Sequence, residues 1–141
     1  MTARGLARGA MVAGVAALGL AGACGPAQQR PDIRLWSDNF AFEISVDSGP
    51  PRARERTVWK VVVRDKSTRQ FVEGGEGRLF AESLDHKRTW NGLLPAPELG
   101  TYVTTLNFVT SGDWAIGLQF RRDSLAPLER VDFMQTVRAA R

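Results

Sequence analysis

The chain of 141 residues contains a single cysteine, Cys24, and a single histidine, His86. Thiol and imidazole groups supply much of the nucleophilic, acid–base and metal-binding chemistry of proteins. One cysteine cannot form a disulfide within the chain or a zinc site with two or more thiolates, and one histidine cannot form a site of several imidazoles. The sequence therefore excludes these metal centres within one copy, and the surroundings of each residue decide its chemistry.

Cys24 lies directly after a segment with the composition of a bacterial secretory signal. Arg4 and Arg8 make the start of the chain basic, and residues 10–23 are uncharged and consist mostly of alanine, glycine, valine and leucine. As a helix this segment is about 21 Å long at ~1.5 Å per residue, shorter than the ~30 Å hydrocarbon core of a bilayer. We therefore predict that residues 1–23 form a helical signal peptide rather than a permanent membrane span.

The residues that precede Cys24, Leu20-Ala21-Gly22-Ala23, resemble the lipobox of bacterial lipoproteins. The resemblance implies cleavage between Ala23 and Cys24, with a diacylglycerol on the Cys24 thiol and often a third acyl chain on the new amino group. Ala21 departs from the pattern, because leucine is commonest at this position. Two acyl chains hold a protein stably on a bilayer. The alternative is a plain secretion signal of the Ala-x-Ala type, in which Cys24 has no role.

After the cysteine, residues 24–31 consist of glycine, proline, alanine, glutamine and arginine, and we predict that they form a flexible tether. Cleavage removes Arg4 and Arg8, so 17 basic and 15 acidic residues remain, a net charge of +2. Such a small charge does not indicate nucleic-acid binding. Gly25 is not the aspartate that favours inner-membrane retention in some bacteria. We expect an outer-membrane anchor where there is an outer membrane, and otherwise one on the outer face of the cytoplasmic membrane.

Alternation of apolar and polar residues with period two dominates residues 32–141, which we predict to be one domain. Turn signals every ~8–12 residues and about seven short strands are typical of an immunoglobulin-like antiparallel β-sandwich. An up-and-down barrel is the alternative fold. Ser111-Gly112 predicts a tight turn that joins two strands in a hairpin. The predicted strands are residues 40–46, 57–64, 71–72, 78–84, 102–110, 114–120 and 131–137.

The four tryptophans fall into two pairs. Trp59 and Trp114 lie at inward positions of their predicted strands, so we expect both in the core. Trp36 and Trp90 lie near predicted loops. If they were exposed side by side they would form a stacking surface for a glycan or peptide, although isolated exposed aromatic residues are common. The run Arg52–Arg56 predicts a solvated loop, which near anionic lipid would contribute about 1 kcal/mol per charge.

Catalytic arrangements have little support in the sequence. Asp85 and His86 are adjacent, so on an extended segment their side chains point in opposite directions, and the chain has no G-x-S-x-G nucleophile motif. Glu73 and Glu76 form a carboxylate pair of the kind that glycosidases use, but solvated turn residues are the commoner meaning of such a pair. Residues 74–77 lack the lysine of a phosphate-binding loop. We therefore predict that the protein is not an enzyme.

Two short motifs, Gly100-Thr101-Tyr102 and Ser111-Gly112-Asp113-Trp114, follow the loop 94–99. Together they resemble the YtkA-like and FixH-like domains of bacteria over about residues 40–121. The resemblance implies a small immunoglobulin-like sandwich, often tethered to a membrane, in which the G-x-Y and G-x-W strands form the last hairpin.

The same resemblance suggests copper handling, because such domains are sometimes associated with copper delivery to respiratory oxidases. Their methionine and histidine ligands lie in the loop before the G-x-Y strand, and soft ligands of this kind suit copper. Residues 83–90 offer His86 but no methionine, and Lys87 and Arg88 beside it repel a cation. We expect His86 to be exposed or to cap a loop, and we expect no metal site and no cofactor.

The sequence thus predicts a non-enzymatic binding or accessory module in the bacterial envelope. Its predicted partners are the membrane, through a lipid anchor at Cys24, and an envelope protein, without nucleic acid. One alternative is a ligand-poor relative of domains that handle copper or assemble respiratory oxidases. A small hydrolase that depends on His86 is the other.

Overall fold

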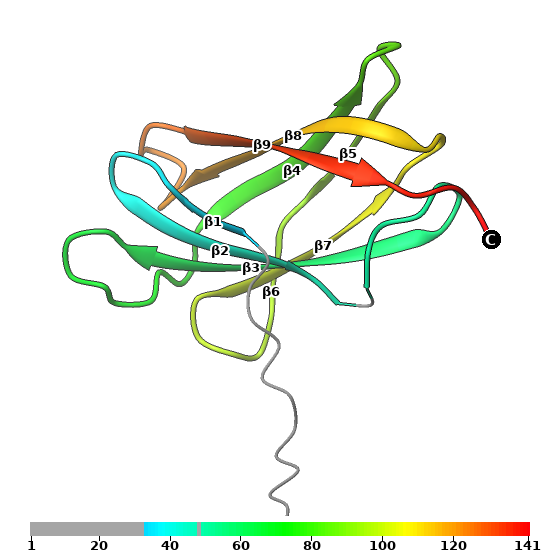
Figure 1. The fold of residues 1–141 in the computed structure, drawn as a ribbon. Coiled ribbons are helices and arrows are strands. Elements are labelled where there is room, and N and C mark those ends of the chain that lie inside the picture. The colour runs from blue at the N-terminus through cyan, green and yellow to red at the C-terminus, as the bar shows by residue number, and fades with distance from the viewer. Residues whose placement is uncertain (1–32, 48) are drawn as a thin grey trace, which may run out of the picture.

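The computed structural model describes residues 33–47 and 49–141 (Figure 1). The predicted signal peptide, the tether, the cleavage site at Ala23 and the lipid attachment site at Cys24 lie outside these residues. Within the described residues there are nine strands and no helix, hence none long and apolar enough to cross a membrane. The strands are β1 Ile33–Trp36, β2 Phe40–Val46, β3 Arg56–Asp65, β4 Glu76–Ser83, β5 Arg88–Gly92, β6 Leu94–Pro95, β7 Thr101–Asn107, β8 Gly112–Arg121 and β9 Glu129–Val137.

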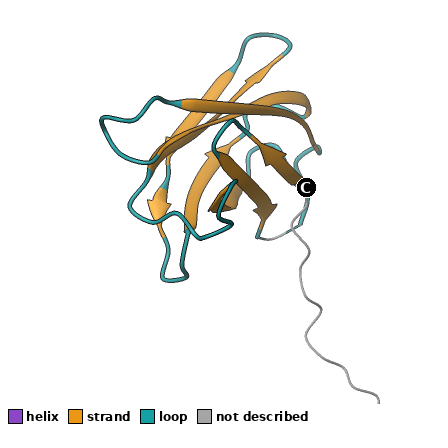
Figure 2. Cartoon of the chain, turned by 90° about the vertical axis from the view of Figure 1, so that its left-hand side faces the viewer, coloured by secondary structure: helices purple, strands orange, loops and turns teal. Residues whose placement is uncertain are grey.

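The strands of this described part form two antiparallel sheets that pack face to face (Figures 1 and 2). One sheet has the order β1-β2-β3-β7-β6, and the other has the order β5-β4-β8-β9. The chain changes sheet three times, between β3 and β4, between β5 and β6, and between β7 and β8. In order, β2-β3-β7-β6 match strands A, B, E and D of an immunoglobulin domain, and β4-β8-β9 match C, F and G. The predicted immunoglobulin-like β-sandwich is therefore confirmed.

The core forms where the inward residues of the two sheets meet. On β3, Trp59, Val61 and Val63 are buried and alternate with residues that are only partly covered, as the period-two pattern predicts. Aromatic rings fill the centre of the sandwich. The ring of Phe120 on β8 meets Phe40 edge-on at 5.0 Å between centroids and Tyr102 at 5.4 Å. Side chains from both sheets thus interlock in one apolar layer.

The predicted strand pattern is wrong at three places. About seven strands were expected, but β1, β5 and the short β6 are additional. Residues 71–72 form no strand, since Phe71 makes only an isolated bridge with Arg64. β7 and β8 are not a hairpin, because they belong to different sheets. The link between them crosses the sandwich, and Phe108 and Trp114 at its two ends pack together with their ring centroids 5.1 Å apart.

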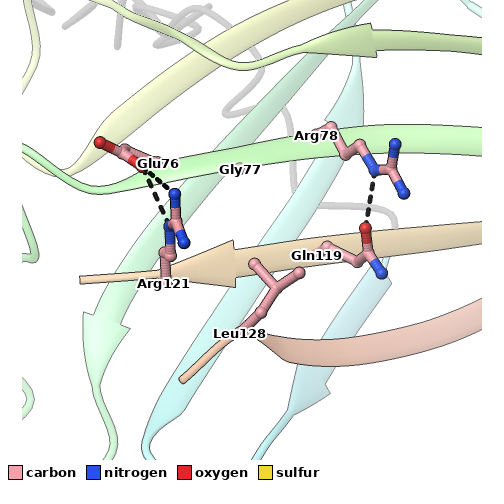
Figure 3. A pocket seen from close by; sticks show the side chains of 6 residues that line it. All are labelled: Glu76, Gly77, Arg78, Gln119, Arg121 and Leu128. Atoms are coloured by element: carbon pink, nitrogen blue, oxygen red, sulfur yellow. Dashed lines mark hydrogen bonds and ion pairs between the residues drawn. The ribbon is translucent and has the colours of Figure 1, made fainter. Parts of the chain in front are cut away.

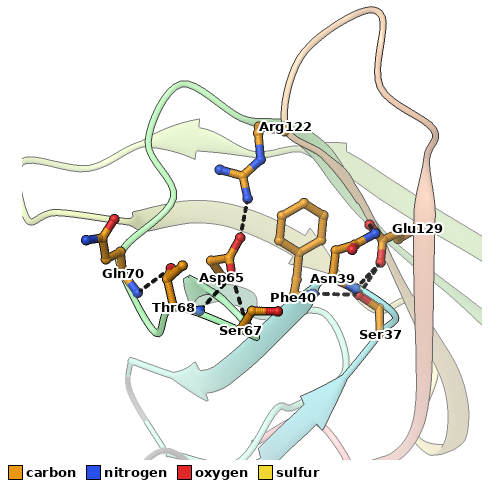
Figure 4. Close-up of polar contacts among 9 residues, drawn as sticks. All are labelled: Ser37, Asn39, Phe40, Asp65, Ser67, Thr68, Gln70, Arg122 and Glu129. Carbon is orange, nitrogen blue, oxygen red and sulfur yellow. Dashed lines mark hydrogen bonds and ion pairs between the residues drawn. The ribbon is translucent and has the colours of Figure 1, made fainter.

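Two acidic residues tie the sheets together at one end of the sandwich (Figure 4). Asp65 at the end of β3 accepts hydrogen bonds from the backbone N–H groups of Ser67 and Thr68, which lower its pKa, and it pairs with Arg122 beyond β8 at 2.7 Å. Glu129 on β9 accepts a 2.7 Å hydrogen bond from the Ser37 hydroxyl in the β1–β2 turn. Each contact joins an element of one sheet to an element of the other.

Candidate functional site

His86 lies in the tight turn between β4 and β5, with a left-handed φ of 61°. Its side chain is 83% exposed, and its Nδ1 lies 2.9 Å from Oε1 of Glu82. The residue is therefore exposed, as predicted, but the segment around it is a turn and not an extended loop. The histidine sits at the tip of a hairpin and not in a cleft between the sheets.

The carboxylates near His86 are bound to other partners. Asp85 accepts a hydrogen bond from the Ser83 hydroxyl and pairs with Lys87 at 2.9 Å, and these contacts lower its pKa to about 2. Hydrogen bonds from His86 and Arg88 likewise lower the pKa of Glu82. Asp85 therefore stays ionised and bound to its neighbours, a poor position from which to orient the imidazole as a base.

The sequence also suggested an acidic pair, Glu73 and Glu76. Glu73 lies before β4 and Glu76 is its first residue, and both are exposed. The carboxylate of Glu76 accepts hydrogen bonds of 2.8 and 3.0 Å from the guanidinium of Arg121 on β8. Both hydrogen bonds go to Oε2, so Glu76 is held in an exposed ion pair across two strands. Within the part of the chain that the structure describes, no group of three or more histidine, cysteine and acidic side chains is placed to hold a metal ion.

Trp59 and Trp114 are buried, as predicted, and Trp36 and Trp90 are 60% and 66% exposed. The two exposed rings do not form one patch. Trp36 is on β1 at one edge of its sheet, whereas Trp90 is on β5 of the other sheet. Beside Trp90, the amide of Asn91 donates a 3.2 Å hydrogen bond to the Thr105 carbonyl on β7. β5 therefore lies on the side of the sandwich away from β1.

The run Arg52–Arg56 is more ordered than a solvated loop. Ala53 is buried, and its N–H donates a 2.8 Å hydrogen bond to the Arg138 carbonyl. Arg54 has a φ of 63°, and its N–H bonds to the Phe108 carbonyl at 2.8 Å. The run is thus held by its backbone at the end of the sandwich where β9 finishes.

The strongest candidate site is the outward-facing surface of the β5-β4-β8-β9 sheet, called here the outer face. The strand register places Trp90, Phe80, Gly117 and Asp132 side by side across its four strands. A Cβ atom on Gly117 would lie only 2.2 Å from Cζ of Phe80, so the Phe80 ring lies directly over this glycine. Glycine leaves room for the ring to lie against the sheet, beside the exposed indole of Trp90.

Four arginines surround this aromatic pair, and three of them have acidic partners. Arg88 pairs with Glu82 at 3.1 Å, and Arg121 and Arg130 pair with Glu76 and Asp132, each at 2.8 Å. The fourth arginine of the outer face is Arg78.

Arg78 has no acidic partner among the described residues. Its Nε donates a 2.7 Å hydrogen bond to Oε1 of Gln119 (Figure 3). Its guanidinium carbon lies 5.6 Å from the centroid of the Phe80 ring and 5.9 Å from that of Trp90. The outer face therefore combines an uncompensated positive charge with two aromatic rings, and such a combination can attract an anion and stack on a flat group.

Three shallow clefts adjoin one another on the outer face. The first lies between the Glu76–Arg121 pair and the Arg78–Gln119 pair, beside Leu128 (Figure 3). The second lies between Arg78 and Arg88 and includes Phe80 and Trp90. The third is lined by Phe80, Glu82, Leu84, His86, Arg130 and Met134, among others. Outward residues of β4 line all three clefts, so they form one elongated surface.

Sequence reasoning missed this site. The predicted strand 78–84 contains Arg78 and Phe80 two residues apart, so period two places them on one face. The alternation does not reveal which residues lie beside this face, and the strand register places Trp90 of β5 and Gly117 of β8 there. No family model matches the chain, and no curated protein matches it either.

Proposed function

We propose that this chain is a lipid-anchored, extracytoplasmic binding module of the bacterial envelope, which holds a partner against the outer face and catalyses no reaction. The anchor rests on the lipobox resemblance at Cys24. One observation carries the binding role: exposed Trp90 and uncompensated Arg78 lie together on a sheet whose opposite side is packed in the core. Aromatic residues and arginine are the residue types that contribute most at binding surfaces.

The placement of His86 supports a binder over a hydrolase. A general base needs a nucleophile within hydrogen-bond reach and a group that orients it. The His86 ring contacts the carboxylate of Glu82, which also pairs with Arg88. On the outer face, by contrast, the side chains offer stacking, charge and hydrogen bonds, which are sufficient for recognition.

The anchor is tested by mass spectrometry of the protein extracted from membranes. We expect the mature chain to begin at Cys24 and to carry the mass of a diacylglycerol with or without a third acyl chain. A Cys24→Ser variant should lose the lipid and leave the membrane fraction. An unmodified chain that begins at another residue contradicts the anchor.

The binding face is tested by site-specific photocrosslinking in cells. A photoreactive phenylalanine analogue at position 90 should give a discrete crosslinked product, and the same analogue at position 36 should not. Trp36 is the matched control because it is similarly exposed on the other sheet. Crosslinking at both positions alike, or only at position 36, contradicts the outer face as the binding surface.

A further inference from the structure

We propose that the outer face binds an acidic polysaccharide, with a sugar ring packed on Trp90 and an anionic group bound by Arg78. This inference rests on the proposed function, because it names the kind of partner that the same face takes. It is carried by the arrangement of side chains in the cleft that lies between Arg78 and Arg88.

The position of the cleft on a sheet face limits how a ligand can be recognised. β4 pairs with β5 and β8 on its two sides, and β8 pairs with β4 and β9. Their backbone N–H and C=O groups are used within the sheet, so the face offers side chains only. An extended peptide gains its affinity from backbone hydrogen bonds at a free sheet edge, which here is the outer side of β5, whereas the cleft lies over the paired strands. A ligand recognised through rings and charges fits it better.

The aromatic residues supply a surface for a ring. Trp90 is 66% exposed and faces solvent on β5, and Phe80 beside it lies over Gly117. Indole and phenyl rings are large, flat and rigid, and they lose little conformational freedom on binding. The apolar C–H face of a sugar packs on the exposed indole of Trp90, because the Phe80 ring already has Gly117 beneath it and the Arg130 guanidinium 4.7 Å from its centroid. Gln119 and Thr89 border the clefts and place hydrogen-bonding groups beside the rings.

The charges favour an anionic group at the Arg78 end of the outer face, whereas Asp113 in the third cleft has no cationic partner among the described residues. Arg78 has no acidic partner among the described residues. Within the same residues its side chain makes one hydrogen bond, from Nε to Gln119, so its terminal N–H groups can bind a ligand. A guanidinium binds a carboxylate through two parallel hydrogen bonds. Across the cleft, Arg88 adds a second guanidinium, which is balanced by Glu82. An anion is therefore expected on the Arg78 side of the cleft.

The length of the outer face indicates a polymer. The clefts follow β4 from Glu76 to Glu82, which is about 20 Å at ~3.3 Å per residue. This length exceeds what one sugar ring covers. The occupant is therefore a chain of acidic sugars that lies along the strand, with the Trp90 and Arg78 cleft at its middle.

The test measures binding of alginate oligosaccharides to the full chain, purified in detergent and immobilised on a biosensor. We expect saturable binding that Trp90→Ala and Arg78→Gln each weaken at least tenfold. Trp36→Ala and Arg34→Gln are matched controls, because both residues are exposed on the other sheet, and they should leave the affinity unchanged. Trp90→Phe and Arg78→Lys should retain part of the binding. Unchanged melting temperatures show that the variants fold.

Two further ligands separate ring recognition from charge alone. Polyglutamate has carboxylates without sugar rings, and dextran has sugar rings without charge, and we expect both to bind at least tenfold more weakly than alginate. Equal binding of either one, or equal losses in the control variants, overturns the inference. Absence of alginate binding also overturns it, and a crosslinked partner at position 90 then leaves the proposed function standing. If crosslinking at position 90 fails as well, both proposals are wrong.

Discussion

The hydroxyl of Tyr102 on β7 donates a 2.8 Å hydrogen bond to the backbone carbonyl of Val72, 30 residues earlier in the chain. The same oxygen accepts a 3.0 Å hydrogen bond from the N–H of Gly75. Burial raises the pKa of Tyr102, so the hydroxyl stays protonated and able to donate. One side chain thereby fixes the segment that carries the chain from β3 in one sheet to β4 in the other.

Removing this hydroxyl should weaken the fold without changing its packing. We expect Tyr102→Phe to lower the free energy of unfolding by about 1–3 kcal/mol, because the Val72 carbonyl and the Gly75 N–H lose their partner. Chemical denaturation of the two proteins measures the difference. A change below about 0.5 kcal/mol would mean that solvent replaces the hydroxyl at both groups.

The two classes of tryptophan should differ sharply in their effect on stability. Trp114 is fully buried against Phe108, and its indole N–H donates a 3.1 Å hydrogen bond to the Thr110 carbonyl. We expect Trp114→Ala to lower the free energy of unfolding by about 3–5 kcal/mol. Trp90→Ala should change it by less than about 0.5 kcal/mol, because its ring is exposed. Similar losses in the two variants would contradict the burial of Trp114.

Acid should destabilise the fold through its hydrogen-bonded carboxylates. Burial alone would raise the pKa of Glu129, but hydrogen bonds from Ser37 and Asn39 outweigh it and the pKa is lowered. The pKa of Asp85 is lowered from 3.8 to about 2. A carboxylate with a lowered pKa in the folded state stabilises the fold above its unfolded pKa, and this contribution is lost as the pH falls through the folded pKa. The melting temperature should therefore fall between about pH 5 and pH 2.

The Glu129→Gln variant isolates one part of this acid dependence. It should melt below the wild type at pH 7, where Glu129 is ionised and holds the β1–β2 turn against β9. The difference in melting temperature should shrink towards pH 2, where Glu129 in the wild type becomes protonated. Calorimetry at several pH values measures both. A difference that stays constant over this range would show that ionisation of Glu129 has no part in it.

His86 should contribute little to stability and nothing to metal binding. Its side chain is largely exposed, so we expect His86→Ala to change the free energy of unfolding by less than about 0.5 kcal/mol. A ligand that binds the folded state raises the melting temperature. Because we expect no metal binding, copper or zinc should leave the melting temperature of the wild type unchanged. A rise of several degrees in the wild type that disappears in His86→Ala would restore a metal-handling role.

The sequence predicts the long strands well, because their alternation is a local property. The pattern of apolar residues locates β2 and β8, and Trp59, Val61 and Val63 mark the inward side of β3. β1 and β5 were not predicted, since each is short and carries an exposed tryptophan, Trp36 at the end of β1 and Trp90 in the middle of β5. Short edge strands are defined by the neighbour with which they pair, and the neighbour is distant in sequence.

The pairing between strands is harder to predict from the sequence than the strands themselves. A tight turn at Ser111-Gly112 predicts a hairpin from local geometry alone, yet the packing of Phe108 on Trp114 directs β7 and β8 into different sheets. The same limit applies to the outer face, because the neighbours of Phe80 follow from the register. The resemblance to YtkA-like and FixH-like domains stays a prediction, although it implies the sandwich that is found. Its expected last hairpin is formed instead by β8 and β9.

The three crossings of the chain between its sheets set the order in which the domain can fold. β3 needs β7 as its neighbour, and β4 needs β8, so segments from both halves of the chain complete each sheet. During synthesis, which starts at the amino terminus, β1, β2 and β3 are complete before the other strands. At that stage the chain lacks the second sheet, which would cover their apolar side. Such non-local pairing makes folding slow and late. The topology therefore delays closure of the core until β8 has been synthesised, so the first three strands keep an uncovered apolar side for most of that time.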